Sequence, residues 1–192
     1  MTPVTHAQRV LVLGGTSSGK SSFAERLLTD ETVDPSTEFR YLATGRENPD
    51  DPDWQARIGA HRARRGADWH TVECGTDPDR LLDALAEAPA DSVVLVDDVG
   101  GWAGTLLDAA PDGPDPSDTG AATDHPARLA DAVRNCPARR LVLVSPEVGL
   151  SVVPATRSGR LFTDLLGACN RAVADACDAV ALVVAGRVLW LP

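Results

Sequence analysis

A glycine-rich segment near the start of the chain has the composition of a phosphate-binding loop (P-loop). Residues 14–21 read GGTSSGKS, which fits the pattern G-x-x-x-x-G-K-S, and they follow the apolar run 10–13. Glycines let the backbone curl so that several N–H groups point at one phosphate, and the positive end of the following helix favours the same anion. Lys20 adds a charge near the β- and γ-phosphates, and Ser21 offers a hydroxyl to Mg²⁺. The expected phosphate-binding residues are Gly14, Gly15, Thr16, Ser17, Ser18, Gly19, Lys20 and Ser21. The chain is therefore expected to bind a nucleoside triphosphate (GTP or ATP), and the alternative is a glycine-rich turn without a ligand.

A second candidate for chemistry is His61, which arginines surround in the sequence. Arg57, Arg62, Arg64 and Arg65 all lie close to it along the chain. Their positive charge disfavours protonation of the imidazole, which leaves a neutral nitrogen that can attack a phosphorus atom. Guanidinium groups also stabilise the charge that develops on a phosphate during such an attack. The alternatives are a surface histidine and a helix with a solvated basic face.

Two neighbouring carboxylates follow a predicted buried strand. The apolar run 92–97 ends at Asp97, and Asp98 comes next. An acid at the end of such a strand associates with Mg²⁺ in phosphoryl-transfer enzymes. Because side chains alternate along a strand, only one of the pair is expected to face the nucleotide, and Asp97 is expected because it directly ends the run. Ser21 and Asp97 are thus the predicted metal ligands, with a helix cap or a turn as the alternative role for Asp97.

The composition indicates one globular domain over residues 1–192, with 43% hydrophobic residues. A net charge of −10 argues against broad attraction to nucleic acid, so the basic cluster near His61 suits a small polyanion such as a triphosphate. The four cysteines have no C-x-x-C spacing, which indicates neither a metal site nor a disulfide framework. No signal-peptide core and no apolar run of about 20 residues is found, so the protein is expected in the cytoplasm with reduced thiols.

Apolar runs alternate with helical patterns, which is typical of an α/β fold with a mainly parallel central sheet between helices. A final pair of strands around residues 185–186 predicts an antiparallel strand at the C-terminus. The stretch 109–126 is rich in Pro, Gly and Asp and is predicted to be a mobile loop. The expected strands are 10–13, 39–43, 71–73, 92–97, 140–145, 179–184 and 188–191. The expected helices cover 20–28, 54–65, 78–85, 102–107, 127–135 and 161–177.

These motifs, in this order, resemble the bifunctional adenosylcobinamide kinase/adenosylcobinamide-phosphate guanylyltransferase family of cobalamin biosynthesis. A P-loop alone occurs in proteins of many functions, but a P-loop followed by R-I-x-x-H and W-x-T-x-E is far narrower. The resemblance covers nearly the whole chain. It rests on the P-loop segment 14–25, YLAT at 41–44, R-I-x-x-H at 57–61, W-x-T-x-E at 69–73, VLVD at 94–97, EVG at 147–149, VP at 153–154 and R-x-F-x-D-x-x-G-x-x-N at 160–170.

The resemblance implies a RecA-like P-loop fold, a homotrimer and two linked reactions. The family phosphorylates the hydroxyl of the aminopropanol arm of adenosylcobinamide, and then transfers GMP from GTP to that phosphate with release of pyrophosphate. The transfer passes through a guanylylated histidine, which corresponds to His61. The implied nucleotide contacts beyond the P-loop are Thr44, Gly45, Arg46, Arg62, Ala63, Arg64, Arg65, Glu73 and Asp97. Two alternatives stay open: a P-loop kinase or nucleotidyltransferase with a non-corrinoid substrate, and a non-catalytic nucleotide-binding regulator.

The chain departs from the family pattern at several loop positions. The family usually has Arg at Ser17, Cys-Leu-Thr at 98–100, Asn at Thr105, Asn at Pro146, Gly at Ser151 and Gln at Arg171. The changes after strands lie where substrate is expected to bind. They leave Lys20, Ser21, His61 and Asp97 intact.

Overall fold

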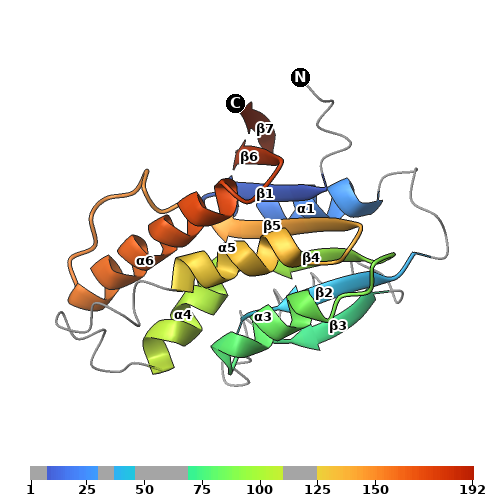
Figure 1. The fold of residues 1–192 in the computed structure, drawn as a ribbon. Helices are drawn as coiled ribbons and strands as arrows, with labels where there is room; N and C mark the ends of the chain where they lie inside the picture. The colour runs from blue at the N-terminus through green and yellow to red at the C-terminus, as the bar shows by residue number, and fades with distance from the viewer. Residues whose placement is uncertain (1–7, 30–36, 46–68, 110–124) are drawn as a thin grey trace, which may run out of the picture.

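The computed structural model describes residues 8–29, 37–45, 69–109 and 125–192, and their arrangement is shown in Figure 1. Within these ranges seven strands form one sheet in the order β3-β2-β4-β5-β1-β6-β7. The strands are β1 (Arg9–Gly14), β2 (Phe39–Ala43), β3 (Trp69–Glu73), β4 (Val93–Asp97), β5 (Arg140–Pro146), β6 (Ala179–Val184) and β7 (Arg187–Leu191). The helices are α1 (Lys20–Thr29), α3 (Pro78–Ala86), α4 (Val99–Ala109), α5 (His125–Asn135) and α6 (Arg157–Ala174).

All strand pairs in this sheet are parallel except the last, in which β7 runs antiparallel to β6. The central strands β1, β4 and β5 are rich in Val and Leu and are buried on both faces, as expected for strands covered by helices on each side. Strand β5 lies between β1 and β4. The carboxyl ends of the parallel strands therefore meet at one edge, where the P-loop begins.

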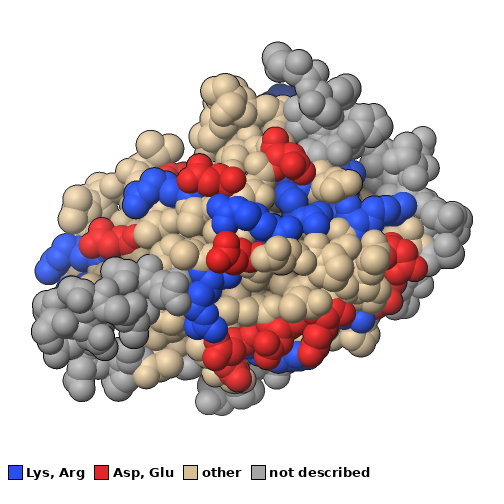
Figure 2. Space-filling model, viewed as in Figure 1, with Lys and Arg blue, Asp and Glu red and all other residues tan. Residues whose placement is uncertain are grey.

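Helices cover both faces of the sheet. In Figure 1 α3, α4, α5 and α6 lie in front of it and α1 lies behind. The apolar side chains divide accordingly, because alternate residues of one strand face opposite layers. Leu141 and Leu143 of β5 pack in the core under the front helices, whereas Val142 and Val144 pack with Leu28 of α1. Figure 2 shows charged side chains of both signs over the front helices, with acidic groups gathered over α3.

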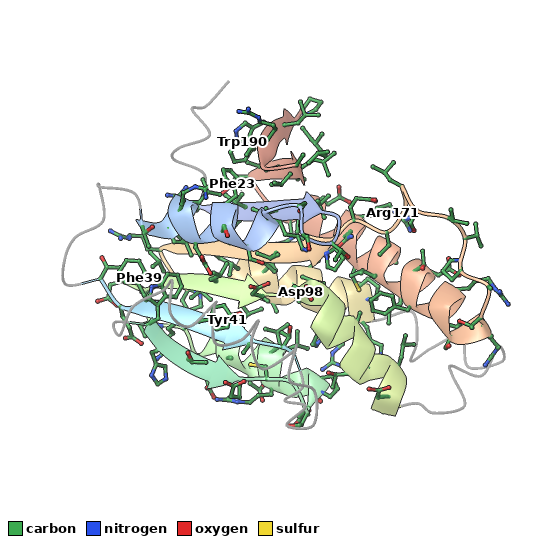
Figure 3. The ribbon with its side chains drawn as sticks, turned by 180° about the vertical axis from the view of Figure 1, so that it is seen from behind. Phe23, Phe39, Tyr41, Asp98, Arg171 and Trp190 are labelled. Atoms are coloured by element: carbon green, nitrogen blue, oxygen red, sulfur yellow. The ribbon has the colours of Figure 1, made fainter. Side chains whose placement is uncertain are left out.

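A tight hairpin joins β6 to β7 beside the P-loop. Its two turn residues, Ala185 (φ 49°) and Gly186 (φ 73°), both have positive φ, which defines a type I′ turn. The Gly186 N–H donates a 2.9 Å hydrogen bond to the carbonyl of Ser18 in the P-loop. Trp190 of β7 packs edge-on against Phe23 of α1 with ring centres 5.9 Å apart, and Figure 3 labels both rings. The C-terminal hairpin thus supports the P-loop and its helix.

The predicted α/β fold with a mainly parallel sheet and a C-terminal antiparallel strand is confirmed, but several element boundaries were wrong. Helix α4 begins at Val99 rather than at 102, because two glycines in its first turns allow close packing; a Cβ at Gly101 would lie 2.7 Å from Thr44 Oγ1. The predicted loop 109–126 is too long at both ends. Ala109 belongs to α4, and Pro126 lies in the first turn of α5, where proline is tolerated.

Helix α6 also differs from its predicted range of 161–177. It begins at Arg157, because the Thr156 side chain caps it by accepting a hydrogen bond from the Gly159 N–H, and it ends at Ala174. The helix predicted over 54–65 and residues 110–124 of the predicted loop lie outside the described residues. In the part of the chain that the structure describes, no helix is both long and apolar enough to span a bilayer.

Candidate active site

The P-loop leaves β1 and curls into the start of α1. Ser17 (φ 57°) and Gly19 (φ 92°) adopt the left-handed conformation, and the Ser18 N–H donates to the Gly15 carbonyl at 3.3 Å. The Lys20 ammonium folds back over the loop and donates to the same carbonyl at 3.3 Å. Backbone curled in this way at a helix N-terminus presents N–H groups and positive charge to an anion.

Glycine is required at the first P-loop position because the loop packs against itself and against β6. A Cβ at Gly14 would lie 2.4 Å from Ser18 Oγ and 2.7 Å from the Val183 carbonyl oxygen. At Gly15, in contrast, no atom lies within 4 Å of the Cβ position. Gly14 thus serves packing, and Gly15 leaves open space on the exposed side of the loop.

The structure brings Ser21, in the first turn of α1, together with Asp97 at the end of β4, although β5 separates β4 from β1, the strand that leads into α1. The Ser21 hydroxyl donates to Asp97 Oδ1 at 3.3 Å, and the Tyr41 hydroxyl donates to Asp97 Oδ2 at 3.2 Å. A hydroxyl and a carboxylate oxygen are hard ligands of the kind that Mg²⁺ binds, together with phosphate oxygens and water. These two side chains therefore fit a magnesium ion beside the P-loop.

Sequence reasoning missed the role of Tyr41. Its side chain is buried on β2, where it pairs in register with Leu95 of β4, while Asp97 pairs with Ala43. Asp97 is two residues beyond Leu95 on β4, so its side chain is on the same face of the sheet as that of Tyr41 and within reach of a long side chain. The signal was the tyrosine of the YLAT motif in a strand next to the acid-bearing strand, but the pairing of β2 with β4 was not known from the sequence.

Asp98 also lies near the P-loop, where β4 passes into α4 (Figure 3). Its Oδ1 accepts a 2.7 Å hydrogen bond from the Gly101 N–H, which caps α4. Burial raises the pKa of Asp98 above its usual value, whereas the glycine N–H groups and the Lys20 charge act in the opposite direction. The peptide bond between Asp97 and Asp98 is cis.

Three further expected nucleotide contacts, Thr44, Gly45 and Glu73, lie at or just after the ends of β2 and β3. Thr44 is fully buried, and its hydroxyl donates to the Asp98 carbonyl at 2.5 Å, so it joins the end of β2 to the start of α4. Gly45 follows and is half-buried. Glu73 is exposed at the end of β3, in register with Ala43, which is in register with Asp97. Two strand spacings, about 10 Å, thus separate Glu73 from Asp97 along the same edge.

The expected site residues Arg46, His61, Arg62, Ala63, Arg64 and Arg65 lie outside the described residues.

The carboxyl end of β5 is held between the P-loop and α6. The Glu147 N–H donates to the Gly14 carbonyl at 3.1 Å. Ser145 donates to Asn170 Oδ1 at 2.6 Å, and the Asn170 amide donates to the Pro146 carbonyl at 3.0 Å. Asn170 of the 160–170 motif therefore positions a strand end that borders the P-loop, which sequence reasoning had not assigned to it.

A parallel sheet, a P-loop after its first strand, and an acid on β4 that reaches the P-loop serine define a P-loop nucleotide-binding protein. Over residues 10–191 the chain matches the model of a family described as "Cobinamide kinase / cobinamide phosphate guanyltransferase". This match covers most of the chain, and the chain belongs to that family. The predicted membership is confirmed.

Named relatives agree with this assignment. The chain is 36% identical over 185 residues to "Bifunctional adenosylcobalamin biosynthesis protein CobP" of Pseudomonas aeruginosa, covering 93% of this chain and 94% of the relative. It is 36% identical over 183 residues to "Bifunctional adenosylcobalamin biosynthesis protein CobU" of Salmonella typhimurium and 37% identical over 183 residues to that of Escherichia coli, covering 92% of this chain and 96% of each relative.

The fold also resembles a solved structure described as "a prototypical ATPase from the type III secretion system of pathogenic bacteria". The TM-score is 0.54 at 13% identity, over 91% of this chain and 50% of that one, so the chain spans half the length of that protein. At this identity the likeness supports the P-loop ATPase type of fold and nothing more.

Proposed function

We propose that this protein phosphorylates adenosylcobinamide with a nucleoside triphosphate and then transfers GMP from GTP to adenosylcobinamide phosphate through a guanylylated His61. The observation that carries the proposal is the contact between Ser21 and Asp97 beside Lys20, in a chain of the cobinamide kinase/guanyltransferase family. One triphosphate site supports both reactions, because the phosphorus that faces the nucleophile decides the outcome.

In the kinase step the P-loop holds the β- and γ-phosphates, and Lys20 stabilises the charge that develops on them. The substrate hydroxyl oxygen attacks the γ-phosphorus, the bond from that phosphorus to the bridging oxygen breaks, the nucleoside diphosphate leaves, and the hydroxyl proton passes to solvent. Ser21 and Asp97 would hold Mg²⁺, which when bound neutralises phosphate charge. Tyr41 would fix the orientation of the Asp97 carboxylate through its hydrogen bond.

In the guanylyl step a neutral His61 nitrogen attacks the α-phosphorus of GTP. The bond to the bridging oxygen breaks, pyrophosphate leaves, and a phosphorus–nitrogen bond holds GMP on the histidine. A phosphate oxygen of adenosylcobinamide phosphate then attacks the same phosphorus, the phosphorus–nitrogen bond breaks, and the imidazole is restored. The step requires His61 about 3–3.5 Å from the α-phosphorus, in line with pyrophosphate.

The resemblance to the family further supports a homotrimer, which sedimentation velocity of the full chain would measure. We place the enzyme in the cytoplasm, in keeping with its four free cysteines, Cys74, Cys136, Cys169 and Cys177.

The test is the reaction itself, with adenosylcobinamide, GTP and Mg²⁺ followed by liquid chromatography and mass spectrometry. The wild type should form the phosphate and then the GDP-linked corrinoid. Lys20→Ala should lose both products, because both need the P-loop, whereas His61→Ala should still form the phosphate but not the GDP-linked product. A protein that binds GTP but forms neither corrinoid product would favour a non-corrinoid substrate or a regulatory role.

A further inference from the structure

The loop between β5 and α6 begins beside the P-loop and exposes large apolar side chains. Leu150 is 82% exposed, Val152 is 91% exposed and Val153 is 75% exposed. Among the described residues the other large apolar side chains with comparable exposure lie on the C-terminal hairpin. A cluster of exposed apolar side chains on a globular protein marks a surface that binds something.

This apolar loop, residues 148–156, is held in shape from both ends. At its start the Glu147 carboxylate accepts hydrogen bonds from the N–H groups of Gly149 (3.0 Å) and Leu150 (2.9 Å). At its end the Arg160 guanidinium donates to the carbonyls of Pro154 (3.1 Å) and Ala155 (2.8 Å). The side chains of Glu147 and Arg160 thus form hydrogen bonds with the backbone of the loop. The side chains of Leu150, Val152 and Val153 are left facing solvent.

The position of the apolar loop connects it to the proposed site. The Glu147 N–H donates to the carbonyl of Gly14, the first P-loop residue, so the loop leaves the sheet where the phosphates would bind. In Figure 1 it runs from the end of β5 to the start of α6, which extends beyond the edge of the sheet. A large molecule bound to the P-loop phosphates would therefore lie close to the start of this loop.

The chemistry of the apolar loop selects among the molecules that the proposed function involves. Residues 148–156 contain no ionisable side chain. Figures 1 and 2 share one view, and where Figure 1 draws this loop the surface in Figure 2 is tan, the colour of uncharged residues. Such a surface has nothing to attract a triphosphate, but it suits a wide macrocycle whose rim carries methyl groups and uncharged amides. The corrin ring of cobinamide has this character.

We propose that Leu150, Val152 and Val153 form the surface on which the corrin ring of the substrate rests, while its arm reaches the P-loop. The inference rests on the proposed function and adds to it the residues that select a corrinoid. Burial of exposed apolar side chains against the ring supplies the affinity, and the hydrogen bonds of Glu147 and Arg160 keep the loop ready to bind.

The test compares two double variants with the same substitutions in the full chain. Leu150→Asn with Val152→Thr changes the apolar loop, and Leu189→Asn with Val184→Thr changes exposed residues of the C-terminal hairpin. Equilibrium dialysis with cobinamide measures the dissociation constant, titration with a fluorescent GTP analogue measures nucleotide binding, and light scattering measures the assembly mass. The loop variant should weaken cobinamide binding at least about tenfold, with unchanged nucleotide affinity and unchanged mass. The hairpin variant should keep all three values within about twofold of the wild type.

Three other outcomes would overturn the inference, and they differ from one another. Unchanged cobinamide affinity in the loop variant would show that the ring binds elsewhere. A change in the assembly mass, whatever the affinity, would make the loop a contact between copies of the chain. If the wild type itself bound GTP but no cobinamide, the proposed function would fail first, and the inference with it.

Discussion

Gly100 and Pro146 lie so close together at the carboxyl edge of the sheet that position 100 has no room for a side chain. A Cβ at Gly100 would lie 2.9 Å from Pro146 Cγ and 3.0 Å from Pro146 Cδ. The chain departs from the family pattern at both positions, since the family usually has Thr at position 100 and Asn at position 146. The two departures therefore form one structural change, because the proline ring fills the space that a threonine side chain would need.

This relationship predicts coupling between the two positions. Gly100→Ala should lower the free energy of unfolding by about 1–3 kcal/mol, because the new methyl group overlaps the proline ring. In the Pro146→Ala background the same change should cost less, with a coupling energy of about 1 kcal/mol or more in a double-mutant cycle by urea denaturation. Gly104→Ala in the same helix is the control, since no atom lies within 4 Å of its Cβ position, and it should stabilise by up to about 1 kcal/mol. Additive effects at positions 100 and 146 would show that the two positions do not constrain each other.

The second prediction concerns the carboxylate that meets the P-loop serine. Asp97→Asn keeps the size of the side chain but removes its charge, so the rate of phosphorylation should fall about 100-fold or more, because phosphate charge is no longer balanced. Tyr41→Phe removes only the hydrogen bond to Oδ2 and should lower the rate by less than about tenfold. Steady-state rates over a range of Mg²⁺ concentrations measure both effects. An Asp97→Asn enzyme with wild-type rate and magnesium dependence would remove Asp97 from the site.

A third prediction follows from the buried thiols. Burial raises the pKa of Cys169 from 9.0 to about 12, and no opposing charge lowers it. The unfolded chain releases this proton near pH 9, whereas the folded chain holds it up to a pH of about 12. The free energy of unfolding therefore falls as the pH rises above about 9. At pH 10 this amounts to about 1.4 kcal/mol for one thiol.

The measurement compares the wild type with Cys169→Ala at pH 8 and pH 10 by urea denaturation. The variant should be less stable than the wild type at pH 8, because it lacks packed atoms, and the difference should shrink by about 1.4 kcal/mol at pH 10. An equal difference at both pH values would mean that the thiol ionises as readily in the folded chain as in the unfolded one.

Much of the fold could be predicted from the sequence, because the relevant signals are local. The buried runs of β4 and β5 and the P-loop between β1 and α1 each lie within a few consecutive residues. Boundaries were wrong where a residue was interpreted by its usual preference. Glycines at 100 and 101 hid the start of α4, yet they are required there by close contacts with Pro146 and Thr44.

Relationships between distant segments could not be predicted in this way. The hydrogen bond from Tyr41 to Asp97 depends on β2 pairing with β4, and the contact of Gly186 with Ser18 depends on β6 lying beside β1. Periodicity indicates which face of a strand is buried but not which strand is its neighbour. The resemblance to a family was therefore more informative about the site than the pattern of any single segment.

The central claim is that His61 carries GMP. The most direct measurement is incubation of the pure protein with GTP and Mg²⁺, followed by intact mass and peptide mapping. We expect an acid-labile GMP adduct on His61. Lys20→Ala should abolish both nucleotide binding and the adduct, whereas His61→Ala should abolish the adduct while GTP still binds. A wild-type protein that binds GTP under these conditions without any adduct on His61 would contradict the covalent mechanism.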